Sequence, residues 1–287
     1  MGLYISNIAS MFALRHLNDA QNALDTSMKR LASGKRINSA KDDPAGFQIA
    51  HRLTSEIDGL TQGNRNAQDG LSLAQTAEGA LDEMVNMMQR VRTLAQQSAN
   101  GTNSRNDRIA LNEEAKQLYE EINRISKDTT FAGEKILDGS KGEVFLQVGA
   151  YSGQGFSMNL SDGFTVEEMA KRVGGDTETT FQNGFDLTTS ESSQNVLAHI
   201  DDLIGVVSAK QGELGGVQSR LESTIRYQSN SICNLSDARS RIEDTDYASE
   251  ISNYIQKQIQ MQAAMTVLSQ ANQSKNMILS LIQSAFG

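Results

Sequence analysis

The residue types that most often carry out chemistry are few in this chain and far apart. The histidines are His16, His51 and His199, and none stands in a His-Glu-x-x-His pattern that would place two zinc ligands on one helical face. No Walker loop and no Gly-x-Ser-x-Gly elbow occurs. Adjacent acidic residues more simply cap helices or face solvent than act as an acid and base couple; these pairs are Asp42-Asp43, Glu113-Glu114 and Asp201-Asp202. We therefore expect no catalytic site, no bound metal and no cofactor.

The single cysteine, Cys233, excludes an intrachain disulfide and a metal cage built from thiolates. It falls inside a helical pattern, and free cysteine is among the residue types most often buried. We expect Cys233 to be a small buried apolar residue on a helix.

Composition and charge favour a helical protein that does not bind nucleic acid. The 287 residues include one proline, no tryptophan and 5% aromatics, which suits long helices better than a β-sandwich or an ordinary α/β enzyme. The net charge is −9, and the basic cluster at residues 29–36 is followed closely by Asp42-Asp43. Because phosphate binding needs a clustered basic surface, nucleic acid is excluded as a partner.

Helical periodicity predicts three helices in the first half of the chain. The first carries an apolar seam and ends near Gly34, which suits a left-handed cap. After an extended connector, Pro44 suits the first turn of a second helix, with Asp42 or Asp43 as its cap. That helix runs for about 54 residues from Ala45. A turn at 100–104 and a third helix at 107–126, folded back antiparallel, complete this half.

The periodicity changes after Phe131. Residues 143–148 and 156–160 are expected to be two strands around a glycine-rich turn, and residues 165–173 a short helix. Residues 174–194 are the least helical stretch and the expected exposed tip, and helical spacing resumes at Val196. The fold class is thus mainly α, a long antiparallel bundle built from both chain ends with a small central β-hairpin region. The predicted divisions are 1–44, 45–173, 174–194, 195–240 and 241–287.

The stretch from Ile251 to Gly287 is apolar-periodic and carries only two charges, Lys257 and Lys275. A helix with so little charge has no face suited to bulk water, so it should complete its folding against copies of itself. The first helix has a similar seam, which includes Gln21 as its polar member. The residues expected to form a polymerising inner core are Leu14, Leu17, Leu24, Met28, Leu31, Ile255, Met261, Met265, Leu268, Leu279 and Ile282.

Several long segments resemble the signature segments of bacterial flagellin. They are residues 30–46 (RLASGKRINSAKDDPAG), 66–79 (NAQDGLSLAQTAEG) and 236–248 (SDARSRIEDTDYA), and the ending around residues 268–281 is also similar. The resemblance implies a filament subunit of the swimming propeller, with terminal helices in the inner core surrounded by longer helices and a β-hairpin region. Only residues 174–194 stand where many flagellins carry outer domains, so the chain resembles a short flagellin.

The resemblance also implies a location and partners. These are an extracellular flagellum, copies of the chain, an export chaperone at the C-terminal helix, and the filament cap and hook-associated proteins. The start of the chain lacks a basic region and a small-residue cleavage site before Arg15, so export without a cleaved signal peptide is expected. No run reaches the roughly 18 apolar residues of a membrane helix, so membrane insertion is not expected.

One patch is similar to the flagellin segment that a host innate immune receptor binds. It comprises Gln89, Arg90, Leu94 and Gln97, with Glu114 on the neighbouring helix. Arg90 and Leu94 are four residues apart and therefore share a helical face. The alternative is that this face packs against the adjacent subunit. Both can hold, because a receptor that reads an assembly surface would recognise monomers and ignore filaments.

Two other functions remain open from the sequence. A junction protein between hook and filament would share the terminal helices, but residues 66–79 and 236–248 follow the flagellin form closely. A membrane-active amphipathic protein could also carry a weakly charged C-terminal helix, but it would need basic residues on its polar face and aromatic anchors. Residues 251–287 offer only two lysines, Tyr254 and Phe286.

Overall fold

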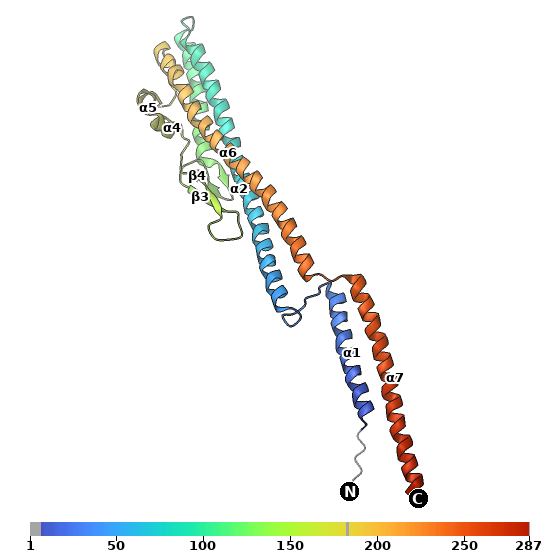
Figure 1. The fold of residues 1–287 in the computed structure, drawn as a ribbon. Coiled ribbons are helices and arrows are strands. Elements are labelled where there is room, and N and C mark those ends of the chain that lie inside the picture. The colour runs from blue at the N-terminus through green and yellow to red at the C-terminus, as the bar shows by residue number, and fades with distance from the viewer. Residues whose placement is uncertain (1–6, 182–183, 287) are drawn as a thin grey trace. The chain divides into compact units, whose positions relative to one another are not determined.

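The chain folds into long helices with two small β-hairpins. The computed structural model describes residues 7–181 and 184–286, with side chains described as far as residue 274 (Figure 1). The elements in order are α1 (Ile8–Ser33), α2 (Pro44–Ala99), α3 (Arg105–Asp128), β1 (Thr130–Phe131), β2 (Glu134–Lys135), β3 (Gly142–Gln147), β4 (Gly155–Leu160), α4 (Val166–Val173), α5 (Asp176–Phe181), α6 (Ser190–Glu243) and α7 (Tyr247–Phe286). The mainly α fold class with a small central β region is confirmed.

Two compact units divide the chain. The terminal unit combines Met1–Ser55 with Cys233–Gly287, and the central unit is Glu56–Ile232. The sequence predicted boundaries at residues 44 and 240, which differ from the borders of these compact units. The predicted positions lie near helix ends, since α2 starts at Pro44 and α6 ends at Glu243. A helix can therefore continue from one compact unit into the next, which periodicity alone does not reveal.

In the terminal unit, α1 and α7 lie side by side and run antiparallel (Figure 1). Near one end of the pair the Asn7 amide Nδ2 donates to the Ala271 carbonyl at 2.7 Å. Near the other end Arg30 Nη1 lies 3.5 Å from Glu250 Oε2. The segments that follow α1 and precede α7 are also joined, since the Thr245 amide donates to the Gly34 carbonyl at 2.9 Å.

The helix ends form where the sequence indicated. Gly34 closes α1 in the left-handed conformation with φ 71°, and its amide donates to the Arg30 carbonyl at 2.9 Å. Asp43 caps α2, because its Oδ1 accepts from the Gly46 amide at 2.9 Å. Asp42 closes the preceding turn by accepting from the amides of Asn38 and Ser39.

In the central unit, α3 folds back antiparallel along α2, as expected. Arg108 Nε, near the start of α3, donates to the Ser98 carbonyl at 2.9 Å, and Glu114 pairs with Arg90 one and a half turns further along. The helix starts at a capping box, in which Ser104 and Asp107 each accept from the other's backbone amide.

The β-hairpin of residues 143–160 is confirmed as β3 and β4, which pair antiparallel with Val144 opposite Met158. A second hairpin, β1 with β2, was not expected from the sequence because each of its strands has only two residues. Both lie in the central unit and contribute apolar side chains to its core.

Residues 174–194 are not a simple exposed tip, and that expectation was wrong. Residues 176–181 form α5, and Phe181, Phe185 and Leu187 are buried. The Leu187 carbonyl accepts from the Ser98 hydroxyl at 2.8 Å. A segment rich in Gly, Thr and Ser can still be held by a few apolar side chains at irregular spacing, which a search for periodicity passes over.

Candidate functional site

The contact between α1 and α7 is a thin seam, in which small side chains alternate with leucines along α1. On α1 the members are Ala13, Leu17, Ala20, Leu24, Ser27 and Leu31, of which the small ones are buried and the leucines half-buried. On α7 they are Glu250, Tyr254, Lys257, Met261, Ala264, Leu268 and Ala271. Both sets follow the three-and-four spacing of paired helices. The seam is shallow because its fully buried apolar members are alanines.

The α1 seam expected from the sequence divides into two stripes in the structure, and only one of them meets α7. Leu14 and Met28, assigned to the same seam as Leu17, Leu24 and Leu31, are 50% and 51% exposed. Together with Gln21 they form a second stripe at intervals of seven residues, beside the one that meets α7. Alanine and serine at 13, 20 and 27 gave too weak an apolar signal to identify the inner stripe.

On α7, bulky apolar side chains face outward. Ile251 is 46% exposed, Ile255 48% and Ile259 61%, and they are four residues apart along one face. Met265 is also exposed, whereas Met261 and Leu268 lie in the seam. The side chains of Leu279 and Ile282 lie outside the described residues. On α1, Ile8, Met11 and Phe12 are exposed apolar residues that the sequence interpretation did not select.

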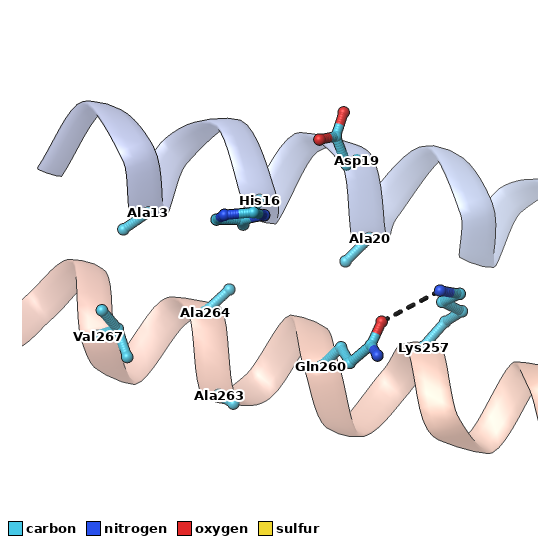
Figure 2. A pocket seen from close by; sticks show the side chains of 9 residues that line it. All are labelled: Ala13, His16, Asp19, Ala20, Lys257, Gln260, Ala263, Ala264 and Val267. Atoms are coloured by element: carbon cyan, nitrogen blue, oxygen red, sulfur yellow. Dashed lines mark hydrogen bonds between the residues drawn. The ribbon is translucent and has the colours of Figure 1, made fainter. Parts of the chain in front are cut away.

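A hollow of about 540 Å³ opens on one flank of the α1 and α7 pair. Figure 2 shows Ala13, Ala20 and Ala264 directed into the space between the helices, with His16 beside them on α1. Lys257 Nζ donates to Gln260 Oε1 at 3.2 Å along the α7 side. The hollow exists because alanines at successive seam positions leave volume that larger side chains would fill.

In the central unit, an exposed charged pair joins α2 and α3. Arg90 Nε donates to Glu114 Oε1 at 2.8 Å, and the second guanidinium nitrogen Nη2 lies 2.7 Å from the same oxygen. Gln89 and Gln97 are exposed nearby on α2. These four residues lie at the surface where the sequence placed them.

Leu94 does not belong to this exposed face, so its assignment as a surface contact was wrong. Its side chain is 1% exposed and belongs to the core of the central unit. The turn of α2 around it is buried on more than one side, because Val91, Ala95 and Ser98 are buried as well. A spacing of four residues keeps two side chains near one face, but the packing of neighbouring helices decides where that face ends.

Cys233 is exposed, so the expectation of a buried thiol was wrong. The buried stripe of α6 ends at Gln228, and residues 229–243 are exposed or half-buried. Helical context predicts burial only where another element covers the helix.

The residues that could bind a metal ion or act in catalysis lie apart from one another in the described part of the chain. Over residues 7–181 and 184–286, no three His, Cys, Asp or Glu side chains gather in a way that could hold a metal ion. His199 Nδ1 lies 3.1 Å from the Thr177 hydroxyl and 3.6 Å from Asp202 Oδ2, as part of a local polar contact. Among the described helices, none combines the length and apolarity that crossing a membrane requires.

Comparison with known proteins identifies the family. The model of the bacterial flagellin N-terminal helical region matches residues 5–142, and that of the C-terminal helical region matches residues 197–282. A flagellin of Halalkalibacterium halodurans is 41% identical over 277 residues, with 96% of this chain and 98% of that protein covered. Flagellin A of Vibrio cholerae is 35% identical over 374 aligned positions, covering 97% of this chain and 98% of the relative.

A solved structure supports the same fold. A protein from Vibrio parahaemolyticus described as flagellar hook-associated superposes with a TM-score of 0.59 at 18% identity, covering 71% of this chain and 100% of that one. The two family matches and the identities over nearly the whole length show that the chain belongs to the bacterial flagellins, and it is thus a structural subunit of the extracellular flagellar filament.

Proposed function

We propose that the outward apolar side chains of α1 and α7 are the contacts through which copies of this chain assemble, and that the chain acts as a structural element without catalysis. The observation that carries the proposal is the row formed by Ile251, Ile255 and Ile259, each about half exposed or more. A row of branched aliphatic side chains facing water is unfavourable in an isolated chain. Burial against a neighbour would recover roughly 25 cal/mol for each Å² of apolar surface covered.

The central unit needs no such partner. Its core includes fully buried large side chains from helices and strands alike, among them Leu81, Met84, Phe164 and Phe181. The contact between α1 and α7, by contrast, closes over alanines and leaves Ile251, Ile255 and Ile259 outside. Assembly through the terminal unit would therefore bury surface that the monomer cannot bury by itself.

The test is a pair of substitutions on the outer face of α7. Ile255→Ala with Ile259→Ala keeps helix propensity and removes about three carbons from each side chain, worth roughly 0.8 kcal/mol per buried CH₂. We expect the critical concentration for filament formation to rise by at least about tenfold. The matched control is Gln258→Ala with Gln262→Ala, which has the same spacing on exposed positions of the same helix. Equal critical concentrations for the two variants would remove the isoleucine row from the assembly contact.

We propose that the same face of α7 also binds an export chaperone, the filament cap and the hook-associated proteins. A subunit that is exported must keep this apolar row from associating too early, and a chaperone at α7 would do so by covering it. The filament cap and hook-associated proteins would meet it at the ends of the polymer. In pull-down experiments the Ile255→Ala, Ile259→Ala chain should lose chaperone binding, whereas the glutamine control should retain it.

A second proposed function is recognition of the monomer by a host innate immune receptor at Gln89, Arg90, Gln97 and Glu114. The exposed ion pair between Arg90 and Glu114 favours it, because it presents a fixed guanidinium and carboxylate on adjacent helices. Leu94 would act from inside, by packing the helical turn that carries Arg90.

Arg90→Ala separates this function from stability. The pair is exposed, so its loss should cost no more than about 1 kcal/mol of unfolding free energy. Receptor activation by the monomer should nevertheless fall. Arg92→Ala is the matched control, because Arg92 is similarly exposed and paired, with Asp201 on α6. If both variants activate the receptor as strongly as the parent chain, the assignment of this face is wrong.

A further inference from the structure

The turn between α2 and α3 carries an Asn-Gly dipeptide at Asn100 and Gly101. Both residues are exposed and lie just beyond Ala99, the last residue of α2. The side chain of an asparagine can react with the amide nitrogen of the next residue. The reaction is fastest when that residue is glycine, because no side chain hinders the approach. The exposed dipeptide can therefore undergo a chemical change that needs no enzyme.

The Asn100 side chain is folded back over the peptide bond to Gly101. Its Oδ1 accepts from the Thr102 amide at 3.3 Å, and the ring closed by this hydrogen bond contains both Asn100 Cγ and the Gly101 nitrogen. In the part of the chain that the structure describes, the Gly101 amide donates no hydrogen bond. The turn thus holds the two reacting atoms within one small ring and leaves the attacking nitrogen free.

Asn103 lies in the same turn and is also followed by a small residue, Ser104, but both of its reacting groups are engaged. Its side-chain Nδ2 donates to the Gln97 carbonyl at 2.6 Å. The Ser104 amide donates to Asp107 Oδ2 at 2.9 Å, as part of the cap of α3. These hydrogen bonds must break before the same reaction can occur at Asn103. The structure therefore distinguishes two asparagines that are only three positions apart.

We propose that Asn100 is a site of spontaneous deamidation. The Gly101 nitrogen attacks Asn100 Cγ, its proton and the side-chain NH2 group leave together as ammonia, and a cyclic imide remains. Water then opens either carbonyl of the imide, which gives aspartate or isoaspartate at position 100. The overall change exchanges one ammonia for one water, so neither an oxidant nor a cofactor takes part.

The product carries a carboxylate where the chain is made with a neutral amide. Position 100 follows the C-terminal end of α2, where a negative charge is unfavourable. A compensating cation is at hand, because Arg108 Nη2 donates to the Asn100 carbonyl at 3.2 Å. In isoaspartate the backbone also gains one methylene, which lengthens the turn from α2 into α3. The change accumulates with the age of the subunit, because the ammonia is lost to solvent.

Incubation of the full chain at mildly alkaline pH, followed by peptide mapping with mass spectrometry, tests the proposal. Deamidation at Asn100 should be at least about tenfold faster than at Asn103, where two hydrogen bonds oppose it. Peptide mapping also separates Asn100 from the other Asn-Gly pair of the sequence, at residues 183–184. The products should include isoaspartate, which the imide gives and direct hydrolysis of the amide does not. Equal rates at Asn100 and Asn103, or aspartate as the only product, would overturn the proposal.

Gly101→Ala is the matched variant. A Cβ at position 101 would meet no atom within 4 Å, and the φ of Gly101 lies outside the left-handed region, so the turn accepts alanine. The added methyl group hinders the attack on Asn100 Cγ, and the rate at Asn100 should fall by about tenfold or more. The rate at Asn103 should stay the same in both chains. An unchanged rate at Asn100 in the alanine variant would show that the Gly101 nitrogen is not the attacking group.

Discussion

The α1 and α7 pair and the core of the central unit bury very different side chains. The helix pair buries Ala13, Ala20 and Ser27 on one side and Ala264 and Ala271 on the other. The central core fully buries phenylalanines, leucines and methionines contributed by helices and strands, including Phe181 and Leu187 of the segment that looked like a surface tip.

The difference determines how much apolar surface each unit leaves exposed for contact with other molecules. Buried apolar area is the largest favourable term in folding, and large side chains supply more of it than alanines do. The central unit is therefore complete by itself, whereas α7 in the terminal unit keeps Ile251, Ile255 and Ile259 at the surface. We expect stability to be concentrated in the central unit and association in the terminal unit, and the following experiments test that division.

The largest effect should come from removing Ile251–Gly287. The central unit should keep its helical circular dichroism signal and its cooperative unfolding, because its buried core lies within residues 56–232. Polymerisation should be abolished, since the outer row of α7 and one side of the hollow are gone. Electron microscopy and urea denaturation of the shortened chain measure the two halves of this prediction. Filaments formed by the shortened chain would contradict the division.

Amide hydrogen exchange should separate the two units in the monomer. We expect residues 8–33 and 247–274 to exchange at least about a hundredfold faster than the buried stretches of α2 and α6 in the central unit. The physical reason is that isolated helices gain most of their stability from packing, and the seam is thin. Mass spectrometry on monomer and filament provides the comparison, with slower exchange of α7 expected after assembly. Equal protection of both units in the monomer would show that the terminal helices are already stable.

Two leucine substitutions compare the units residue by residue. Leu94→Ala, in the central core, should lower the free energy of unfolding by about 2–5 kcal/mol, because it leaves a cavity. Leu14→Ala, on an exposed stripe of α1, should change it by no more than about 0.5 kcal/mol and instead weaken assembly. Urea denaturation and polymerisation assays on the same preparations measure both. A large loss of monomer stability from Leu14→Ala would place that residue in a seam after all.

The smallest effect concerns the capping carboxylate at the start of α3. The Ser104 hydroxyl that donates to Asp107 holds the pKa of this carboxyl below its usual value. A pKa lowered by folding means that the group stabilises α3 at neutral pH and that this contribution is lost as the pH falls below about 4 through the folded pKa. Asp107→Asn should therefore destabilise the central unit slightly at pH 7 and by less at pH 3. A difference from the parent chain that is the same at both pH values would argue against the cap.

Much of the fold could be predicted from the sequence because it is decided locally. Gly34, Pro44 and the acidic residues around residues 42–43 predicted the end of one helix and the start of the next, and the structure has both within a residue. The β3 and β4 hairpin followed from a glycine-rich turn between two apolar runs. Capping and turn formation depend on residues a few positions apart, so one chain is enough to read them.

The errors share a different cause. Leu94 and Cys233 were placed on the correct helices but on the wrong side with respect to burial. The spacing of apolar residues is the same whether a residue packs against a helix of its own chain or stays exposed for contact with another copy. Small residues such as Ala13 and Ala20, which mark the real seam, carry little apolar signal of their own.

The sequence by itself determined the helices, their ends, the hairpin and, through its long signature segments, the family. Only the tertiary structure decided which apolar stripes are used inside the chain and which remain outside. Burial is a property of two surfaces in contact, and the second surface comes from residues more than two hundred positions away, as Asn7 and Ala271 illustrate. The exposed isoleucines of α7 and the alanine-floored hollow between α1 and α7 became visible only when the two helices were placed side by side.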